Sequence, residues 1–321
     1  MNSVLRTIVF VFIFLFGSTA RSWAQITVPA DTLQADTVNI WDFGGVGTLN
    51  FSQVSLSNWA AGGQNALSVL GIANLYANYK QGKNTWNNAL DITYGTVKLQ
   101  NQQVRKSDDK MELNLKYGHN ASERWYYTVQ MNLKTQLTPT STVTRDTLIS
   151  DFLSPAFVLA SLGMDYKPND KLSVFISPVT GKFTFVKSQV LADKGAFGVQ
   201  GARQDMLGDP VPGTGKHLRK EFGGYVNVRY KEEIVQNVTL QSKLDLFTNY
   251  LNDLKNVDVN WENMVNFKVN KFIAASLFVH LIYDDDVNVA VDRNKDGQAD
   301  GSGPRLQLKE TLGIGLSYKF E

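Results

Sequence analysis

An aspartate-rich segment near the C-terminal end of the chain has the spacing of a cation-binding loop. Asp292, Asn294 and Asp296 alternate, Gly297 follows, and Asp300 lies three residues further on. Oxygen ligands at positions 1, 3, 5 and 9, with glycine at position 6, match the start of a calcium loop. The glutamate usual at position 12 is absent, and the same residue types are common in solvated turns. The sequence therefore predicts no cofactor apart from a weak calcium site, with a plain polar loop as the alternative.

Catalytic signals are few. His119, His217 and His280 are far apart in the sequence, and the chain contains no G-x-S-x-G motif. The glycine-rich stretch 213–216 resembles part of a phosphate-binding loop, but Pro210 stands where that motif needs its first glycine and a histidine replaces its serine or threonine. We expect the protein not to be an enzyme, and an outer-membrane hydrolase is the least favoured function.

The remaining chemically capable residues are charges of both signs, set into segments in which polar and apolar residues alternate. If the polar faces of these segments line one interior, that interior is either a narrow polar channel or a space plugged by its own ion pairs. The balance of charge predicts no strong ion selectivity. The acidic members are Asp91, Glu112, Asp165, Asp245, Asp258 and Glu262, and the basic members are Lys116, Lys134, Arg229, Lys243, Lys268 and Lys309.

The alternation itself predicts β-strands. In 127–134, for example, apolar and aromatic residues occupy every second position and polar residues lie between them. A period of two gives a strand one apolar and one polar face. In the segment 171–186, Pro178 and Gly181 interrupt the pattern, so a shorter strand followed by a separate hairpin is an alternative there. We expect about twelve strands, at 47–57, 66–79, 86–99, 110–120, 125–136, 155–166, 171–186, 220–231, 237–250, 257–269, 272–283 and 305–320.

The connections between these strands differ in length at the two ends. Those after the even-numbered strands are short, whereas 137–154, 187–219 and 284–304 are long. Short periplasmic turns and long extracellular loops are typical of an outer-membrane barrel. The loop 187–219 is long enough to fold into the pore or to cover its mouth.

Aromatic residues cluster beside the short turns. Tyr79 and Trp86 flank the first of them, and Tyr117 and Trp125 flank the second. Amphipathic rings at one depth form the interfacial girdle of a membrane barrel. A soluble β-sandwich is the alternative, but its strands are usually shorter, at about five to six residues. The predicted fold class is therefore all-β, an antiparallel transmembrane β-barrel.

The N-terminal segment predicts export. A basic residue precedes the apolar run 8–16, and small residues follow as far as residue 24. Nine apolar residues in a helix span about 14 Å, too short for a membrane anchor. We expect a signal peptide at 1–24, with cleavage after Ala20 as an alternative, then a periplasmic lead-in at 25–45 and the barrel at 46–321.

Composition agrees with this assignment and excludes other classes. Charged residues make up 19% of the chain and the net charge is +2, with no cysteine. A mean hydropathy of −0.20 is too polar for a helical membrane protein. The near-neutral charge argues against nucleic acid as a partner. The final strand ends in Tyr318 and Phe320, which resembles the signal read by barrel-assembly machinery, so lipid and that machinery are the expected partners.

Several short stretches together resemble an uncharacterised family of secreted proteins from Bacteroidota-type bacteria, classed as a domain of unknown function. They are WDFGG at 41–45, NFSQ at 50–53, SNWAAGG at 57–63, YDDD at 283–286 and GPRLQLKE at 303–310. The resemblance implies an outer-membrane barrel and supplies no activity. We predict a passive channel or transporter for small polar solutes in the outer membrane of a Gram-negative cell. A non-conducting barrel that binds at the surface or organises the membrane is the alternative.

Overall fold

The computed structural model describes residues 40–56, 64–100, 102–141, 147–252, 254–287, 289–291 and 300–320. The predicted signal peptide and most of the predicted lead-in therefore lie outside the described residues. No helix in the described ranges is long and apolar enough to cross a membrane.

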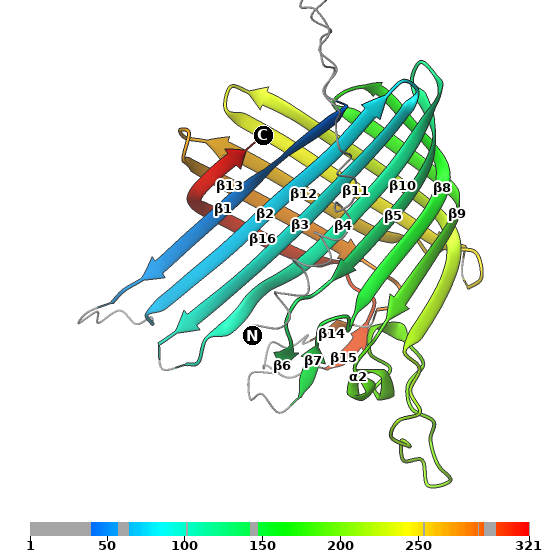
Figure 1. Cartoon of the computed structure of the whole chain (residues 1–321). Helices are drawn as coiled ribbons and strands as arrows, with labels where there is room; N and C mark the ends of the chain where they lie inside the picture. The colour runs from blue at the N-terminus through cyan, green and yellow to red at the C-terminus, as the bar shows by residue number, and fades with distance from the viewer. Residues whose placement is uncertain are drawn as a thin grey trace, which may run out of the picture. The chain divides into compact units, whose positions relative to one another are not determined.

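Twelve antiparallel strands form one closed barrel (Figure 1). Around the ring their order is β1, β16, β13, β12, β11, β10, β9, β8, β5, β4, β3 and β2, so neighbours in sequence are neighbours in space and β16 closes the ring against β1. The predicted fold class and the twelve predicted strands are confirmed. The strands are β1 (Trp41–Val54), β2 (Ala66–Gln81), β3 (Asn84–Leu99), β4 (Arg105–Ser122), β5 (Trp125–Thr135), β8 (Ala156–Asn169), β9 (Leu172–Phe185), β10 (Leu218–Val235), β11 (Val238–Asn249), β12 (Asp258–Lys268), β13 (Ile273–Tyr283) and β16 (Gln307–Phe320).

The short elements lie in the long connections. They are β6 (Thr140–Ser141), β7 (Leu148–Ser150), α2 (Gln189–Asp193), the 3-10 turn η1 (Ala196–Gly198), β14 (Val289–Val291) and β15 (Gly301–Gly303). Figure 1 shows β6, β7, α2, β14 and β15 gathered at one end of the barrel. We call this the long-loop end and the opposite end the short-turn end.

One boundary differs from the prediction. β1 begins at Trp41, and its first residues pair with β2 from Trp41 opposite Tyr79 onwards. Residues 41–45, which we placed in the lead-in, therefore belong to the barrel. Their glycines, Gly44 and Gly45, obscured the strand because glycine carries no side chain to show which face it occupies.

The short turns are tight because particular residues adopt the left-handed conformation. Only Gly82 and Lys83 connect β2 to β3, and Gly82 has a φ of +56°. Asn237, between β10 and β11, has a φ of +65°. Asparagine and glycine reach this region at low cost, which lets two residues reverse a strand.

The strand β9 is continuous and contains a β-bulge at the position of Pro178. Its ladder to β8 jumps between Leu162 opposite Val179 and Met164 opposite Ile176. The buried hydroxyl of Ser177 lies 2.8 Å from the carbonyl oxygens of both Leu162 and Val179. Proline has no N–H to give to the ladder, and the bulge removes that requirement. The alternative of a separate hairpin is wrong.

The bulge leaves no room for a side chain at Gly163 on the neighbouring strand β8. A Cβ added to Gly163 would lie 2.1 Å from the carbonyl oxygen of Ile176, whereas one added to Gly47 would have no neighbour within 4 Å. We therefore expect Gly163→Ala to lower the yield of folded barrel sharply and Gly47→Ala to leave it unchanged. The fraction of protein with the shifted gel migration of a folded barrel, before and after heating, measures this difference. Equal folded fractions for the two variants would contradict it.

The outer face of the barrel is apolar and ends in aromatic rings. At the short-turn end Trp41 packs against Tyr79, with ring centroids 5.2 Å apart, and Trp125 packs against Tyr166 at 4.8 Å. On β3, the outward-facing Trp86 and Tyr94 are 42% and 40% exposed. Eight residues of strand separate them, about 20 Å along the barrel axis at the usual rise and tilt. That height fits an apolar band of about 25 Å between two aromatic girdles.

Candidate functional site

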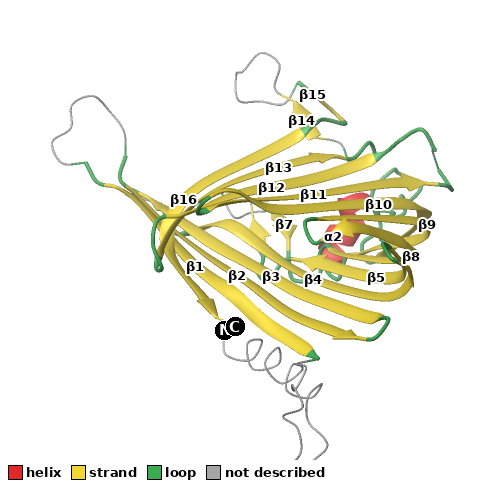
Figure 2. Ribbon diagram, turned by 90° about the horizontal axis from the view of Figure 1, so that it is seen from above, coloured by secondary structure: helices red, strands yellow, loops and turns green. Residues whose placement is uncertain are grey.

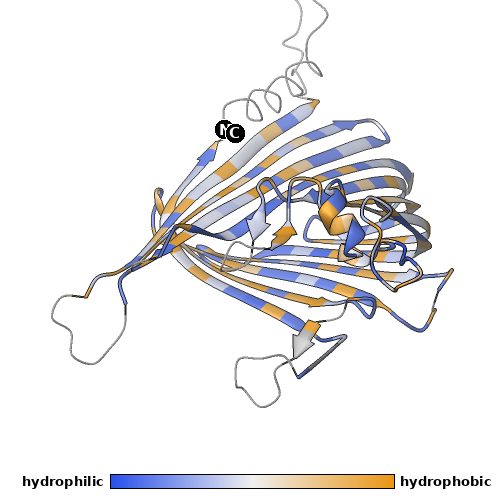
Figure 3. Cartoon of the chain, turned by 90° about the horizontal axis from the view of Figure 1, so that it is seen from below, coloured by the Kyte–Doolittle hydropathy of each residue, from blue (hydrophilic) through white to orange (hydrophobic). Residues whose placement is uncertain are grey.

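The inner face of the barrel is polar and buried. On β4 the inward-pointing side chains are Glu112, Asn114 and Lys116, and on β5 they include Thr128 and Gln130. Each of these residues is at most 6% exposed. The alternation predicted from the sequence therefore places these polar residues in the lumen. Figure 3 shows the alternation itself as hydrophilic and hydrophobic bands along the strands.

Five charged side chains meet across the middle of the lumen, and we call them the central layer: Lys110, Glu112, Lys134, Lys243 and Glu262. The Lys110 Nζ atom on β4 lies 2.9 Å from Glu112 Oε2 and 2.8 Å from Oε1 of Glu262 on β12. The Lys243 Nζ atom on β11 forms an ion pair with Glu112. In a ring of twelve strands β4 and β12 are six strands apart, so they lie on opposite walls.

Contacts between opposite walls require a narrow lumen. A round barrel of twelve strands is about 24 Å across at the usual strand spacing and tilt. A lysine and a glutamate that point toward each other cannot bridge that width. The ring of strands is drawn out toward β1 and β16 (Figure 2), which brings β4 close to β11 and β12.

Amide and imidazole side chains extend the central layer. The Asn132 amide donates to Oε1 of Glu112 at 2.8 Å and to Oδ1 of Asn114 at 2.7 Å. The His280 Nε2 atom donates to Oδ1 of Asn260 at 2.6 Å and lies 3.7 Å from Glu262. Because each buried charge has a partner, the layer is a connected network and not a set of isolated ions.

Further ion pairs lie on both sides of the central layer. Toward the short-turn end, the Lys116 Nζ atom lies 2.8 Å from Asp165 Oδ2. Toward the long-loop end, the Lys182 Nζ atom lies 2.6 Å from Asp258 Oδ2 and 3.7 Å from Glu221 Oε1. Ion pairs therefore occur at three levels of the lumen, which is what the sequence predicted for a polar interior.

Three of these charged lumen residues, Lys110, Lys182 and Glu221, were missed by the sequence analysis. Lys182 lies beyond the bulge at Pro178, which shifts the inward positions of β9 from odd to even numbers, so a strict period of two points it outward. Lys110 faces the same side of β4 as Glu112. It was missed because the predicted strand began at residue 110, whereas β4 begins at Arg105. Lys268, which was predicted to face the lumen, is exposed at the short-turn end of β12.

Residues 186–217, which we call the mouth loop, form a compact unit at the long-loop end. Val186, Leu191, Ala192 and Val199 make a small buried apolar cluster, and Leu148 of β7 packs against it. Figure 3 shows α2 lying over the opening of the barrel at this end. Of the two predicted arrangements, the structure therefore favours a cover over the mouth.

The carboxylate of Asp193 holds the mouth loop together. It accepts hydrogen bonds from the backbone N–H groups of Gly213 and Gly215, each at 2.8 Å, and from the amide of Gln189 at 2.8 Å. The N–H groups of Gly213 and Gly215 lower the pKa of Asp193. The stretch that resembles a phosphate loop thus binds a carboxylate of the chain itself. His217 completes the unit, with Nδ1 2.6 Å from the carbonyl oxygen of Val186.

We expect Asp193→Asn to loosen the mouth loop. A lowered pKa stabilises the folded loop above the ordinary value of 3.8, and that contribution disappears as the pH falls through the lowered pKa. At neutral pH the wild-type loop should therefore resist trypsin at Lys194, and the variant should be cleaved several-fold faster. Asp209→Asn, at the exposed tip of the same loop, is the matched control. Equal cleavage rates for the two variants would contradict this role for Asp193.

The predicted calcium site remains untested. Asp292, Asn294 and Asp296 lie outside the described residues, and Asp300 is exposed beside β15. Within the described ranges, the structure contains no cluster of three or more acidic or histidine side chains that could hold a metal ion. His119, near the short-turn end of β4, is exposed and lies 2.8 Å from Asn84 Oδ1.

A family of unknown function matches part of the chain. Its description is "Protein of unknown function (DUF3078)", and it matches residues 51–140. This confirms the expected resemblance to an uncharacterised family. Among curated proteins nothing matches.

Solved structures similar to this chain are outer-membrane barrels. The porin NanC is 11% identical, with a TM-score of 0.36, over 86% of this chain and all of that one. An outer-membrane channel from Pseudomonas putida F1 is 11% identical, with a TM-score of 0.38, over 89% of this chain and all of that one. The translocator domain of the autotransporter NalP from Neisseria meningitidis is 10% identical, with a TM-score of 0.33, over 87% of each chain. At these TM-scores the similarities say nothing further about this protein.

Proposed function

We propose that the protein is a narrow outer-membrane channel for small polar solutes. The observation that carries this proposal is the largely polar lumen, in which ion pairs occur at three levels beside one small buried cluster of Phe175, Tyr225 and Phe247. Water and small polar solutes can share such an interior, because it offers hydrogen-bond partners along its whole length. The paired charges make the expected ion selectivity weak.

The outer membrane is the location that fits the barrel. The apolar band between aromatic girdles needs lipid, and a closed barrel leaves few unpaired backbone groups in the hydrocarbon. The predicted signal peptide would direct the chain to export, and the final aromatic residues of β16 would be recognised by barrel-assembly machinery. A mature N-terminus at Gln25 in detergent-extracted outer membranes would agree with this location.

A second candidate is a non-conducting barrel. The observation that favours it is the central layer itself, because Lys110 and Glu262 meet directly between opposite walls. Such a barrel would act through its loops, by binding at the surface or by organising the membrane. The two candidates differ in a single measurable property, the passage of ions through the barrel.

Single-channel recording in planar bilayers separates the two candidates. A channel with a central layer should give small, discrete current steps, with a reversal potential near zero in a salt gradient. Liposomes that contain the protein should admit small polar solutes and exclude larger ones. If no current steps are seen in the wild type, nor in variants that remove the central layer, the channel proposal fails and the second candidate stands.

A further inference from the structure

The seam between β1 and β16 is incomplete. The two strands pair over six residues only, from Gly45 opposite Phe320 to Asn50 opposite Gly315, whereas β1 and β2 pair over all fourteen residues of β1. Beyond Asn50, residues 51–54 of β1 and 307–314 of β16 have no ladder partner across the seam within the described ranges. The seam therefore forks toward the long-loop end.

Part of this fork lies at the depth of the hydrocarbon. The outward side chains of Leu312 and Ile314 are 75% and 64% exposed, and they continue the apolar face that ends at Tyr318 in the girdle. An unpaired strand edge facing hydrocarbon is unfavourable, because its N–H and C=O groups have no water to bind. The unpaired N–H and C=O groups of the fork must therefore form hydrogen bonds either with water from the lumen or with a polar group that enters the fork.

An unsatisfied amide stands where the strands diverge. Asn50 is 6% exposed, and neither Oδ1 nor Nδ2 of its side chain has a hydrogen-bond partner within the described ranges. It faces two glycines of β16: a Cβ added to Gly313 would lie 2.9 Å from the Asn50 Nδ2 atom, and one added to Gly315 would lie 2.3 Å from Oδ1. A buried amide without partners is costly, so this position is suited to a polar group that comes from outside the chain.

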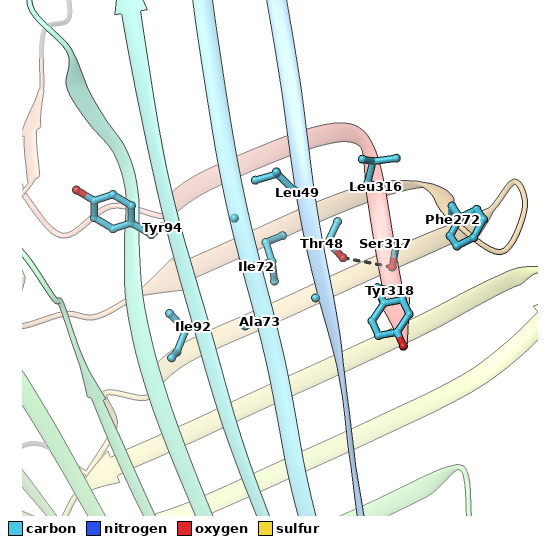
Figure 4. A pocket seen from close by; sticks show the side chains of 12 residues that line it. Thr48, Leu49, Ile72, Ala73, Ile92, Tyr94, Phe272, Leu316, Ser317 and Tyr318 are labelled. Carbon is cyan, nitrogen blue, oxygen red and sulfur yellow. Dashed lines mark hydrogen bonds between the residues drawn. The ribbon is translucent and has the colours of Figure 1, made fainter. Parts of the chain in front are cut away.

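An apolar groove lies beside the fork on the outer wall. Its volume is about 840 Å³. The small residues Gly47, Gly71 and Ala73 form its floor, and larger side chains such as Leu316 and Tyr94 border it (Figure 4). The shape suits one flexible apolar chain, because the floor lacks the large side chains that cover the rest of the outer wall.

The lumen next to the point where the strands diverge is lined by neutral side chains. The ion pairs of the lumen are formed mainly by β4, β8, β9, β11 and β12, away from the seam. The inward-facing residues around Asn50 are instead small, apolar or neutral: Thr48, Asn50 and Ser52 of β1, Leu70 and Ile72 of β2, Ser276 and Phe278 of β13, and Thr311, Gly313, Gly315 and Ser317 of β16. Further toward the long-loop end, Lys309 of β16 has the same inward parity, and its Nζ atom lies 2.5 Å from Asp108 Oδ2 of β4. A molecule that enters the fork beside Asn50 therefore meets neutral side chains before it reaches this ion pair.

We propose that the β1–β16 seam is a lateral portal between the lumen and the bilayer for an amphiphile with an acyl chain. The chain occupies the groove and the fork, and the Asn50 amide binds the polar head group. This route goes beyond the passage of polar solutes through the lumen and does not depend on ion conduction.

A photoreactive fatty acid with a diazirine on its acyl chain next to the head group tests the portal. The full barrel is reconstituted in liposomes that contain this probe, irradiated, and mapped by peptide mass spectrometry. We expect labels on the lumen-facing Ile72 and Thr311 as well as on the outward-facing Leu316. Labels on outward-facing residues only would overturn the proposal. The lumen-facing Gln130 and Thr180, on the far wall, should stay unlabelled, and equal labelling of them would overturn it as well.

A variant that fills the fork provides the matched comparison. Gly313→Phe should reduce the labelling of Ile72 and Thr311 several-fold and leave that of Leu316 unchanged. Because labelling of Leu316 reports that the barrel is folded in the bilayer, the variant is its own control. Unchanged labelling of the lumen residues in a folded variant would overturn the portal.

Cysteine pairs test the fork independently, in a chain that has no cysteine of its own. The Thr48 and Ser317 hydroxyl oxygens are 3.5 Å apart, so Thr48→Cys/Ser317→Cys should form a disulfide spontaneously. Ser52→Cys/Gly313→Cys, which a continued ladder would place opposite each other, should not. Equal oxidation of both pairs would show a closed seam. A disulfide-linked dimer of Leu312→Cys would assign the free edges to a second copy of the chain. Either result would overturn the proposal.

Discussion

Replacing Lys110 and Lys243 by alanine together should raise the single-channel conductance several-fold and make the channel select cations. Both side chains reach across the lumen to carboxylates, so their removal widens the narrowest level. Glu112 and Glu262 then keep only Lys134, whose Nζ atom lies 3.9 Å from Glu262 Oε1, as a nearby cation of the central layer. The net negative field of the two carboxylates favours cations at the constriction. Reversal potentials in a salt gradient measure the selectivity, and current steps measure the width.

The opposite substitution gives the sharpest control. Glu112→Ala together with Glu262→Ala removes a similar volume from the same level but leaves the lysines, so the conductance should rise and the selectivity should turn toward anions. Lys268→Ala, at the exposed end of β12, should change neither property. If both double variants conduct like the wild type, with the same selectivity, the central layer does not limit the passage of ions.

These variants also carry a cost in stability. Removal of one partner of a buried ion pair typically costs about 3–5 kcal/mol, because the other charge is left uncompensated. Each double variant leaves the charges of the central layer unbalanced, so its unfolding should shift to a lower denaturant concentration. Conductance is therefore compared only between proteins that keep the gel migration of a folded barrel.

Replacing residues 187–216 by Asn-Gly should uncover the mouth of the barrel and increase the entry rate of small polar solutes several-fold. The barrel should survive, because Val186 donates a backbone hydrogen bond to His217 at 2.9 Å and Phe185 pairs with Leu218. A two-residue Asn-Gly turn suits a hairpin that closes between such partners. Liposome swelling with a small sugar measures the entry rate.

The Asp193→Asn variant separates the two possible effects of this deletion. If the mouth loop limits entry by covering the opening, the loosened loop of this variant should give a smaller increase in the same direction. If the deletion leaves the entry rate unchanged in a folded barrel, the mouth loop does not limit passage.

The number and faces of the strands could be predicted because the barrel has a simple period. Each strand has one face toward lipid and one toward the lumen. The alternation of polar and apolar residues therefore shows both where a strand lies and which of its side chains face the lumen. Glu112 and Lys116 were placed correctly in the lumen for this reason. The ends of β1 were less predictable, since Gly44 and Gly45 have no side chain to record a face.

The contacts inside the lumen could not be predicted from a period of two. Which lysine meets which glutamate depends on how far the barrel is flattened, and that depends on closure between β1 and β16, at opposite ends of the chain. The inward position of Lys182 depends on a bulge that a proline alone does not locate. The unsatisfied amide of Asn50 becomes visible only when β16 is placed beside it.

Carbodiimide cross-linking of the folded barrel in detergent tests the cross-lumen contacts most directly, since it joins an amine and a carboxylate only where they touch. The structure predicts peptides that link Lys110 to Glu262 and Lys243 to Glu112, and their loss in denaturant. The exposed pair Lys171 and Glu232, 2.5 Å apart at the short-turn end, reports that the reagent is active. A link between Lys110 and Glu112 reports that the reagent enters the lumen. If both of these control links form and neither cross-lumen link does, the opposite walls do not meet and the account of a narrow, ion-paired channel is wrong.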